Sequence, residues 1–144
     1  MKEIVEKLKK EFKGDILEIF EHNERRVYIK IKNETLLRIA EFLHKKLGLR
    51  FVIASATDLK EGFEIIYHFS DDKKSGAMIN IRVLLPHNKP EIESLTQVFR
   101  GAEWIEREIY DLLGIKFLNH PNLVRFLLPE DWPEGVYPLR RESR

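Results

Sequence analysis

Residues 51–85 read FVIASATDLKEGFEIIYHFSDDKKSGAMINIRVLL and contain the clearest structural pattern in the chain. In the second half of this stretch apolar and polar residues alternate, which is typical of strands with one buried face. Short polar turns with a late glycine separate the apolar segments, and turns this short join antiparallel neighbours. We therefore predict an antiparallel meander of strands at Phe51–Leu59, Phe63–Ser70 and Ala77–Leu85.

The residues before the meander predict two helices and a hairpin. Apolar residues recur every four positions from Ile4 to Phe12 among Lys and Glu, which indicates an amphipathic helix that ends at Gly14. A second helix is predicted between Asn33, as its N-cap, and Gly48, as its stop. The hairpin strands lie between the helices, at Ile16–Phe20 and Val27–Lys32.

The order of predicted elements up to residue 85 is α-β-β-α-β-β-β. This order favours a single α+β domain with an about five-stranded, mostly antiparallel sheet and two to three covering helices. Pro86 and Pro90 then interrupt the pattern. We expect an α+β core over residues 1–90, and a helix plus an extended, irregular C-terminal arm over residues 91–144.

The C-terminal region has a composition of its own. Its helical pattern runs from Trp104 to Leu113 and ends at Gly114. Four of the six prolines and both tryptophans lie between Trp104 and Arg144. Proline-rich sequence normally indicates a flexible linker, but disordered segments are poor in the aromatic residues found here. Such an arm must bury its aromatics on its own domain or on another protein.

Composition excludes several classes of function. The net charge of +1 gives no general field to attract nucleic acid or anionic lipid. The absence of cysteine excludes disulfides, thiolate nucleophiles and Cys-ligated Fe–S or zinc sites. No apolar run approaches the roughly 20 residues of a membrane span, so we expect membrane attachment through partners. The 14 Lys, 18 Glu and single Gln follow the trend seen in hyperthermophiles.

A search for catalytic constellations leaves one enzyme hypothesis. His120 sits in the unusual C-terminal region and could act as an acid–base group with Glu106, Glu108 or Asp111. The competing interpretation is a histidine that makes a structural hydrogen bond in a turn. The competing interpretation of the carboxylates is an ion-pair network on a helix, because Arg107 and Asp111 lie four residues apart.

A second alternative is an RNA-binding α/β domain. In such a domain Tyr67 and Phe69 would stack on bases from the face of the sheet. The balanced charge argues against this alternative, since RNA-binding surfaces are basic.

Two consecutive motifs resemble a family signature. Residues 104–117 read WIEREIYDLLGIKF, and residues 119–140 read NHPNLVRFLLPEDWPEGVYPLR. With their E-R-E-x-x-D, H-P-x-L-x-R and G-x-x-P-L-R elements, they resemble the hallmark of the 30 kDa subunit family of respiratory complex I (the NADH dehydrogenase C-subunit). That family includes the equivalent subunits of membrane-bound energy-converting hydrogenases and formate hydrogenlyases. The first 85 residues resemble the family in element order and size.

The resemblance implies a structural subunit without catalytic activity of its own. It implies a place in the peripheral arm of an oxidoreductase complex, on the cytoplasmic side of the membrane, with no cofactor bound to this chain. The implied partners are the large subunit related to the [NiFe]-hydrogenase large subunit (the complex I 49 kDa type) and other peripheral-arm subunits. The electron donor stays open among NADH, ferredoxin and formate, and the complex among quinone reductases and hydrogenases.

The resemblance also implies which residues dock on the large subunit. They belong to the helix that starts the C-terminal region, to the turn after it and to the arm. The predicted docking residues are Trp104, Glu106, Arg107, Glu108, Asp111, Phe117, His120, Pro121, Leu123, Arg125, Asp131, Trp132, Pro138, Leu139 and Arg140.

Overall fold

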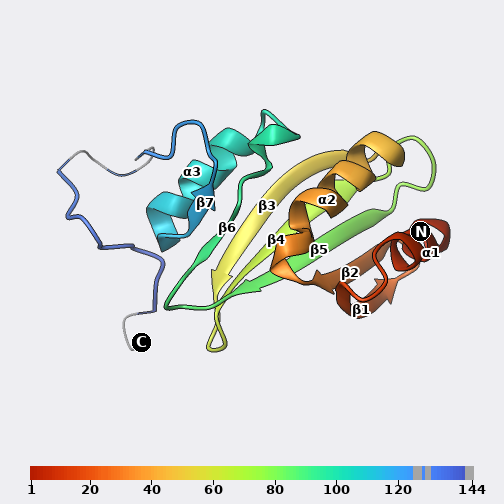
Figure 1. Cartoon of the computed structure of the whole chain (residues 1–144), viewed down its shortest axis with the longest axis horizontal. Helices are drawn as coiled ribbons and strands as arrows, with labels where there is room; N and C mark the ends of the chain where they lie inside the picture. The colour runs from red at the N-terminus through yellow and green to blue at the C-terminus, as the bar shows by residue number, and fades with distance from the viewer. Residues whose placement is uncertain (125–127, 129–130, 142–144) are drawn as a thin grey trace.

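A five-stranded sheet organises the chain (Figure 1). The structure is a computed structural model, and it describes residues 1–124, 128 and 131–141. The strands of the sheet occur in the order β1-β2-β5-β4-β3. All neighbours are antiparallel except β2 and β5, which are parallel. The strands are β1 (Ile16–Asn23), β2 (Arg26–Ile31), β3 (Arg50–Asp58), β4 (Phe63–Ser70) and β5 (Met78–Leu85).

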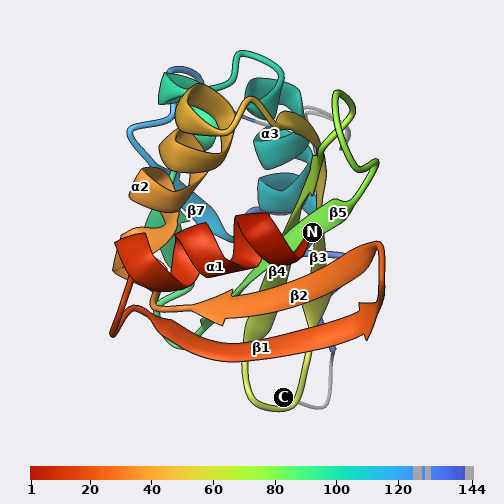
Figure 2. The ribbon, with the colours of Figure 1, turned by 90° about the vertical axis from the view of Figure 1, so that its right-hand side faces the viewer.

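Helices cover one face and one edge of this sheet. Helix α1 (Lys2–Glu11) and helix α2 (Leu36–Glu41), which continues as a π-helical turn over Phe42–Lys46, lie on the same side of the sheet (Figure 2). Helix α3 (Ala102–Leu113) lies beside the edge strand β3. Short 3-10 turns at Asn33–Thr35 and Leu95–Gln97 precede α2 and α3.

The core follows from the alternation in the meander. Phe63, Ile65, Tyr67 and Phe69 of β4 are buried together with the alternate apolar residues of β5. Because Tyr67 and Phe69 point into this core, they cannot stack on RNA bases, and that part of the RNA-binding hypothesis is wrong. The predicted fold class, a single α+β domain with a five-stranded sheet, is confirmed.

Three local features differ from the sequence-based predictions. Asn33 does not cap α2, because its side-chain amide donates a hydrogen bond to the carbonyl of Leu84 at 2.9 Å. Strand β1 runs on to Asn23, so its hairpin turn is shorter than predicted. A parallel pair, β6 (Glu91–Glu93) with β7 (Lys116–Leu118), was not predicted, since three residues are too few to show a strand period.

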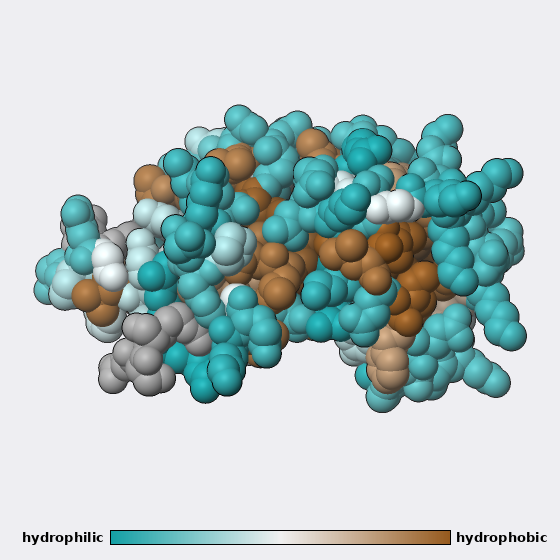
Figure 3. Space-filling model, turned by 60° about the horizontal axis from the view of Figure 1, so that its bottom comes forward, coloured by the Kyte–Doolittle hydropathy of each residue, from teal (hydrophilic) through white to brown (hydrophobic). Residues whose placement is uncertain are grey.

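The surface adds two observations. Within the described part of the chain, no helix has the length and apolarity needed to cross a bilayer. Figure 3 shows apolar side chains gathered in patches on an otherwise hydrophilic face. Leu17 and Phe20 of β1 are among the exposed large apolar residues at one end of the sheet, and Trp104 of α3 lies at the other.

Candidate functional site

The charged residues of α3 are unusual because three of them are buried, namely Glu106, Arg107 and Asp111. Burying a charge is costly unless partners compensate it. Ile109 and Leu113 turn the helix toward β3 and the core, and this orientation places the three charged side chains against the segments before and after the helix.

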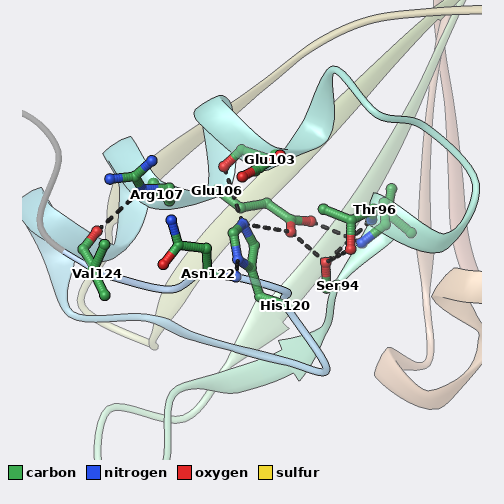
Figure 4. A network of polar contacts seen from close by, with 9 residues as sticks. Ser94, Thr96, Glu103, Glu106, Arg107, His120, Asn122 and Val124 are labelled. Carbon is green, nitrogen blue, oxygen red and sulfur yellow. Dashed lines mark hydrogen bonds and ion pairs between the residues drawn. The ribbon is translucent and has the colours of Figure 1, made fainter.

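Glu106 joins α3 to the segment that precedes it. Its carboxylate accepts hydrogen bonds from the Ser94 hydroxyl at 2.6 Å and from the Leu95 backbone amide at 2.8 Å (Figure 4). Burial raises the pKa of Glu106 to about 7, the two hydrogen bonds act in the opposite direction, and the nearby charge of Glu93 adds to the rise. A buried carboxyl with a shifted pKa is one ingredient of acid–base chemistry, so its neighbours decide its role.

His120 is a titratable neighbour of Glu106, with 3.9 Å between Nε2 and Oε1. The backbone amide of Asn122 lies 3.0 Å from the imidazole Nδ1, and the Glu103 carbonyl oxygen lies 3.0 Å from Nε2. Nδ1 therefore accepts and Nε2 carries the proton that it donates, as in a neutral ring. Both nitrogens bond to backbone groups, which favours the structural interpretation of His120 over the enzyme hypothesis (Figure 4).

Arg107 and Asp111 reach the C-terminal arm. The Arg107 Nε donates to the Val124 carbonyl at 3.2 Å, and its guanidinium lies 5.1 Å from the centre of the Trp104 ring. The Asp111 carboxylate accepts from the backbone amide of Leu128 at 3.4 Å. Glu108, by contrast, is exposed. Arg107 and Asp111 of the predicted E-R-E-x-x-D motif thus fasten the arm to the body of the domain.

The arm returns to the body at its C-terminal end. The backbone amide of Leu139 donates to the Leu112 carbonyl at 2.9 Å, and the Arg140 Nε donates to the Leu113 carbonyl at 2.6 Å. The backbone amide of Arg141 donates to the Asp58 carboxylate at 2.8 Å. A cavity of about 400 Å³ lies between α3 and the arm, with Asp111 and Tyr137 among its lining residues.

The remaining predicted docking residues fall in three settings. Phe117 of β7 is buried in the core, and the partly buried Leu123 packs against this core. Pro121, Asp131 and Pro138 are exposed, whereas Trp132 is half-buried and its indole N–H donates to the Val136 carbonyl at 2.8 Å. Arg125 lies outside the described residues.

Sequence reasoning did not select Ser94, Asp58 or His87, although all three belong to this arrangement. The imidazole Nε2 of His87 lies 2.9 Å from the Asp58 carboxylate that holds Arg141. These residues are far apart in the sequence, and no local motif marks them. Among the described residues, no three His, Asp or Glu side chains are grouped so that they could hold a metal ion.

Comparisons with known proteins give matches over most of the chain. The family model described as "Respiratory-chain NADH dehydrogenase, 30 Kd subunit" matches residues 29–144. The NADH-quinone oxidoreductase C-subunit of Citrifermentans bemidjiense is 33% identical over 142 residues, which cover 96% of this chain and 86% of that protein. Formate hydrogenlyase subunit 5 of Escherichia coli (strain K12) is 32% identical over 139 residues, or 94% of this chain. These residues are 24% of that protein, so the chain spans about a quarter of its length.

Two further matches concern a fused relative and the fold. The NADH-quinone oxidoreductase C/D-subunit of Buchnera aphidicola is 39% identical over 80 residues, which cover 56% of this chain and 13% of that protein. A chain in the structure of the membrane-bound sulfane sulfur reductase, an archaeal respiratory membrane complex, superposes with a TM-score of 0.84 at 21% identity. The superposition covers 96% of this chain and 82% of that chain, and at this identity it shows the shared fold.

Proposed function

Since the chain belongs to the family of the 30 kDa subunit of respiratory-chain NADH dehydrogenase, we propose that it is an assembly subunit whose C-terminal arm docks on a larger redox subunit. It is a complex I 30 kDa-type subunit. Members of this family are subunits of membrane-bound respiratory complexes. In this proposal the chain has no catalytic activity of its own. Its contribution is to hold the partner in position.

One observation carries the docking proposal: the arm is fastened to the body at both ends while apolar residues near and within it remain exposed. Trp104 is 52% exposed beside the start of the arm. Val124 and Val136 are also among the exposed large apolar residues of the chain. Trp and Arg side chains at such positions are typical of the few residues that dominate interface affinity, because they bury much area on a partner.

The large subunit related to the [NiFe]-hydrogenase large subunit is the proposed partner. Fused relatives support this choice. The Buchnera relative is named as a C/D-subunit, so a C-subunit part similar to this chain is joined there to a D-subunit part. In formate hydrogenlyase subunit 5 the similar part is about a quarter of a longer protein. Parts that are fused in one protein commonly correspond to partners that are separate chains elsewhere.

The location follows from this partnership. We propose that the chain sits on the cytoplasmic side of the membrane, attached through the large subunit and other peripheral-arm subunits. The identity of the complex, whether quinone-reducing or hydrogenase-like, would then be set by the large subunit, which is proposed to carry the redox chemistry.

Co-expression with the large subunit of the same complex tests the docking function. In the test variant, residues 125–136 are replaced by a Gly/Ser linker of equal length, which leaves both fastened ends of the arm in place. We expect co-purification to fall at least about tenfold, since the central contacts of an interface carry most of its affinity. The matched control is Phe20→Ala at the far end of the sheet, which should co-purify like the unaltered chain.

The yield of the linker variant decides between two outcomes. Loss of the large subunit from the linker variant alone supports docking through the arm. Equal yields of the large subunit with the linker variant and the unaltered chain would contradict it.

A further inference from the structure

We propose that residues 137–141 act inside this chain, as a latch that closes the C-terminal arm into a loop, and do not bind the partner. The proposal rests on the docking function proposed above and assigns a different task to the end of the arm. It makes Arg140 a positioning residue, although its place in the family motif favoured a direct contact with the partner. The contacts of four residues, Gly114, Tyr137, Arg140 and Arg141, carry the argument.

Gly114 forms the seat of the latch. It ends α3 with a φ of 75°, in the left-handed region that suits glycine, and its backbone amide donates to the Tyr110 carbonyl. A Cβ atom at this position would lie 2.6 Å from the Arg140 Nη2 and 2.6 Å from the Tyr137 Cε2. Real Cβ atoms do not approach other atoms so closely. The arm therefore packs directly on the backbone of Gly114.

The guanidinium of Arg140 lies against Gly114 and contacts other residues of this chain. Its Nε donates to the Leu113 carbonyl at 2.6 Å. This carbonyl lies at the C-terminal end of α3, where backbone carbonyls lack partners within the helix and the helix dipole favours a positive charge. The charged group of Arg140 lies 4.5 Å from the centre of the Tyr137 ring and 5.2 Å from that of Phe63. Cation–π contacts of this kind add to the hydrogen bond.

Asp58 forms the second half of the latch. Its side chain is buried at the end of β3. One carboxylate oxygen accepts the backbone amide of Arg141 at 2.8 Å, and the other lies 2.9 Å from the His87 Nε2. Because the arm contributes a backbone amide here, the side chain of Arg141 is not needed for this hydrogen bond. Arg141 is therefore a matched control for Arg140.

The latch and the start of the arm together define a loop. The start is held by His120 and by the bond from Arg107 to Val124. Between these two ends, the backbone amide of Leu128 also bonds to the Asp111 carboxylate, at 3.4 Å. Closing a loop in advance reduces the conformational freedom that binding would otherwise have to remove. The latch thus prepares the residues between the fastened ends for docking.

Amide hydrogen exchange of the complete free chain, followed residue by residue by NMR, tests the latch. The amides of Leu139 and Arg141 report on it, since they donate to Leu112 and Asp58, and the amide of Gly114 reports on α3. In Arg140→Ala we expect Leu139 and Arg141 to exchange at least about tenfold faster, as local opening predicts, with Gly114 unchanged. In Arg141→Ala all three amides should exchange as in the unaltered chain. Unchanged exchange at Leu139 in Arg140→Ala would overturn the proposal.

A disulfide rescue separates positioning from direct contact. The chain has no cysteine, so Leu112→Cys with Leu139→Cys creates a single pair, at residues whose backbones are hydrogen-bonded and whose side chains line one cavity. We expect Arg140→Ala to weaken binding to the large subunit about tenfold, as the loss of a prepared conformation would. The oxidised pair should restore that binding, and reduction should remove the rescue. If the Arg140→Ala variant still binds the large subunit weakly when the cysteine pair is oxidised, Arg140 contacts the partner directly and the proposal fails.

The latch and the docking function can fail independently. The exchange measurement uses the free chain and holds whether or not the arm binds the large subunit. The linker variant described above tests docking and leaves the latch residues intact. If the linker variant still binds while Arg140→Ala opens the latch, the docking function fails and the latch stands.

Discussion

The imidazole Nε2 of His120 lies 3.0 Å from the backbone carbonyl oxygen of Glu103, so the turn that begins the C-terminal arm is fastened to the first turn of α3. The same ring accepts the backbone amide of Asn122, which holds the turn itself. His120 therefore links the body of the domain to the arm, and its role is open to direct measurement.

Replacing His120 tests this link. In His120→Ala a buried imidazole is lost, and the Glu103 carbonyl and the Asn122 amide lose their hydrogen-bond partner. We expect the free energy of unfolding to fall by about 2 kcal/mol, because a buried side chain and two hydrogen bonds are removed together. Chemical denaturation measures it. The control His22→Ala, on exposed strand β1, should cost less than about 0.5 kcal/mol, and equal losses in both variants would contradict the link.

Glu106 should make stability depend on pH. Its pKa is raised from 4.5 to about 7 in the folded chain, so the folded state favours the protonated carboxyl. The free energy of unfolding should therefore fall as pH rises from about 4.5 through 7. The full difference corresponds to about 3 kcal/mol, since one pKa unit is worth 1.36 kcal/mol.

Comparing Glu106→Gln with the unaltered chain isolates this effect. The glutamine cannot ionise, so the free energy of unfolding of the variant should lack the decline between pH 5 and pH 8. His120, Glu93 and Tyr67 remain as the neighbouring titratable groups in both proteins. The control Glu108→Gln changes an exposed carboxyl on the same helix and should keep the decline. An unchanged pH profile in Glu106→Gln would show that Glu106 is ionised throughout this range.

Gly114 should tolerate a side chain less well than Gly48. Both end helical segments with positive φ, of 75° and 70°, so alanine strains the backbone at both. A Cβ at Gly48 meets nothing within 4 Å, whereas one at Gly114 would collide with Tyr137 and Arg140. We expect Gly48→Ala to cost about 1 kcal/mol, and Gly114→Ala to cost more and to speed amide exchange at Leu139. Equal costs and normal exchange would mean that the arm does not rest on Gly114.

Trp104 should matter for binding and little for folding. Its side chain is 52% exposed, and Phe20 at the far end of the sheet is 54% exposed, which makes the two residues a matched pair. We expect each alanine variant to change the free energy of unfolding by less than about 1 kcal/mol. Affinity for the large subunit should fall at least about tenfold in Trp104→Ala, in line with tryptophan hot spots, and stay unchanged in Phe20→Ala. Calorimetric titration measures this, and the reverse pattern would place the interface on β1.

The meander and the helices could be predicted because their signals are local. Alternation from Phe63 to Phe69 assigned both the strand and its buried face, and Gly114 marked the end of α3. Asn33 was misassigned, because its side chain bonds to Leu84 across the fold and such a partner leaves no trace in the neighbouring sequence. The pairing of β6 with β7 was missed because three residues are too few to show a strand period.

The candidate site was predicted only in part. Glu106, Arg107 and Asp111 of the charged motif lie in one arrangement with His120, and hydrogen bonds from Arg107 and His120 join α3 to the residues that follow it. Asp58 and His87 could not be selected, since folding alone brings them to Arg141. That these residues dock on the large subunit stays a prediction.

Site-specific photocrosslinking tests the central claim most directly. A photoreactive phenylalanine analogue is placed at residue 132, in the middle of the arm, and in a parallel variant at residue 20, on β1. The variants are assembled with the large subunit and irradiated. Docking through the arm predicts a crosslink to the large subunit from residue 132 and none from residue 20. A crosslink from residue 20 with none from residue 132 would contradict it.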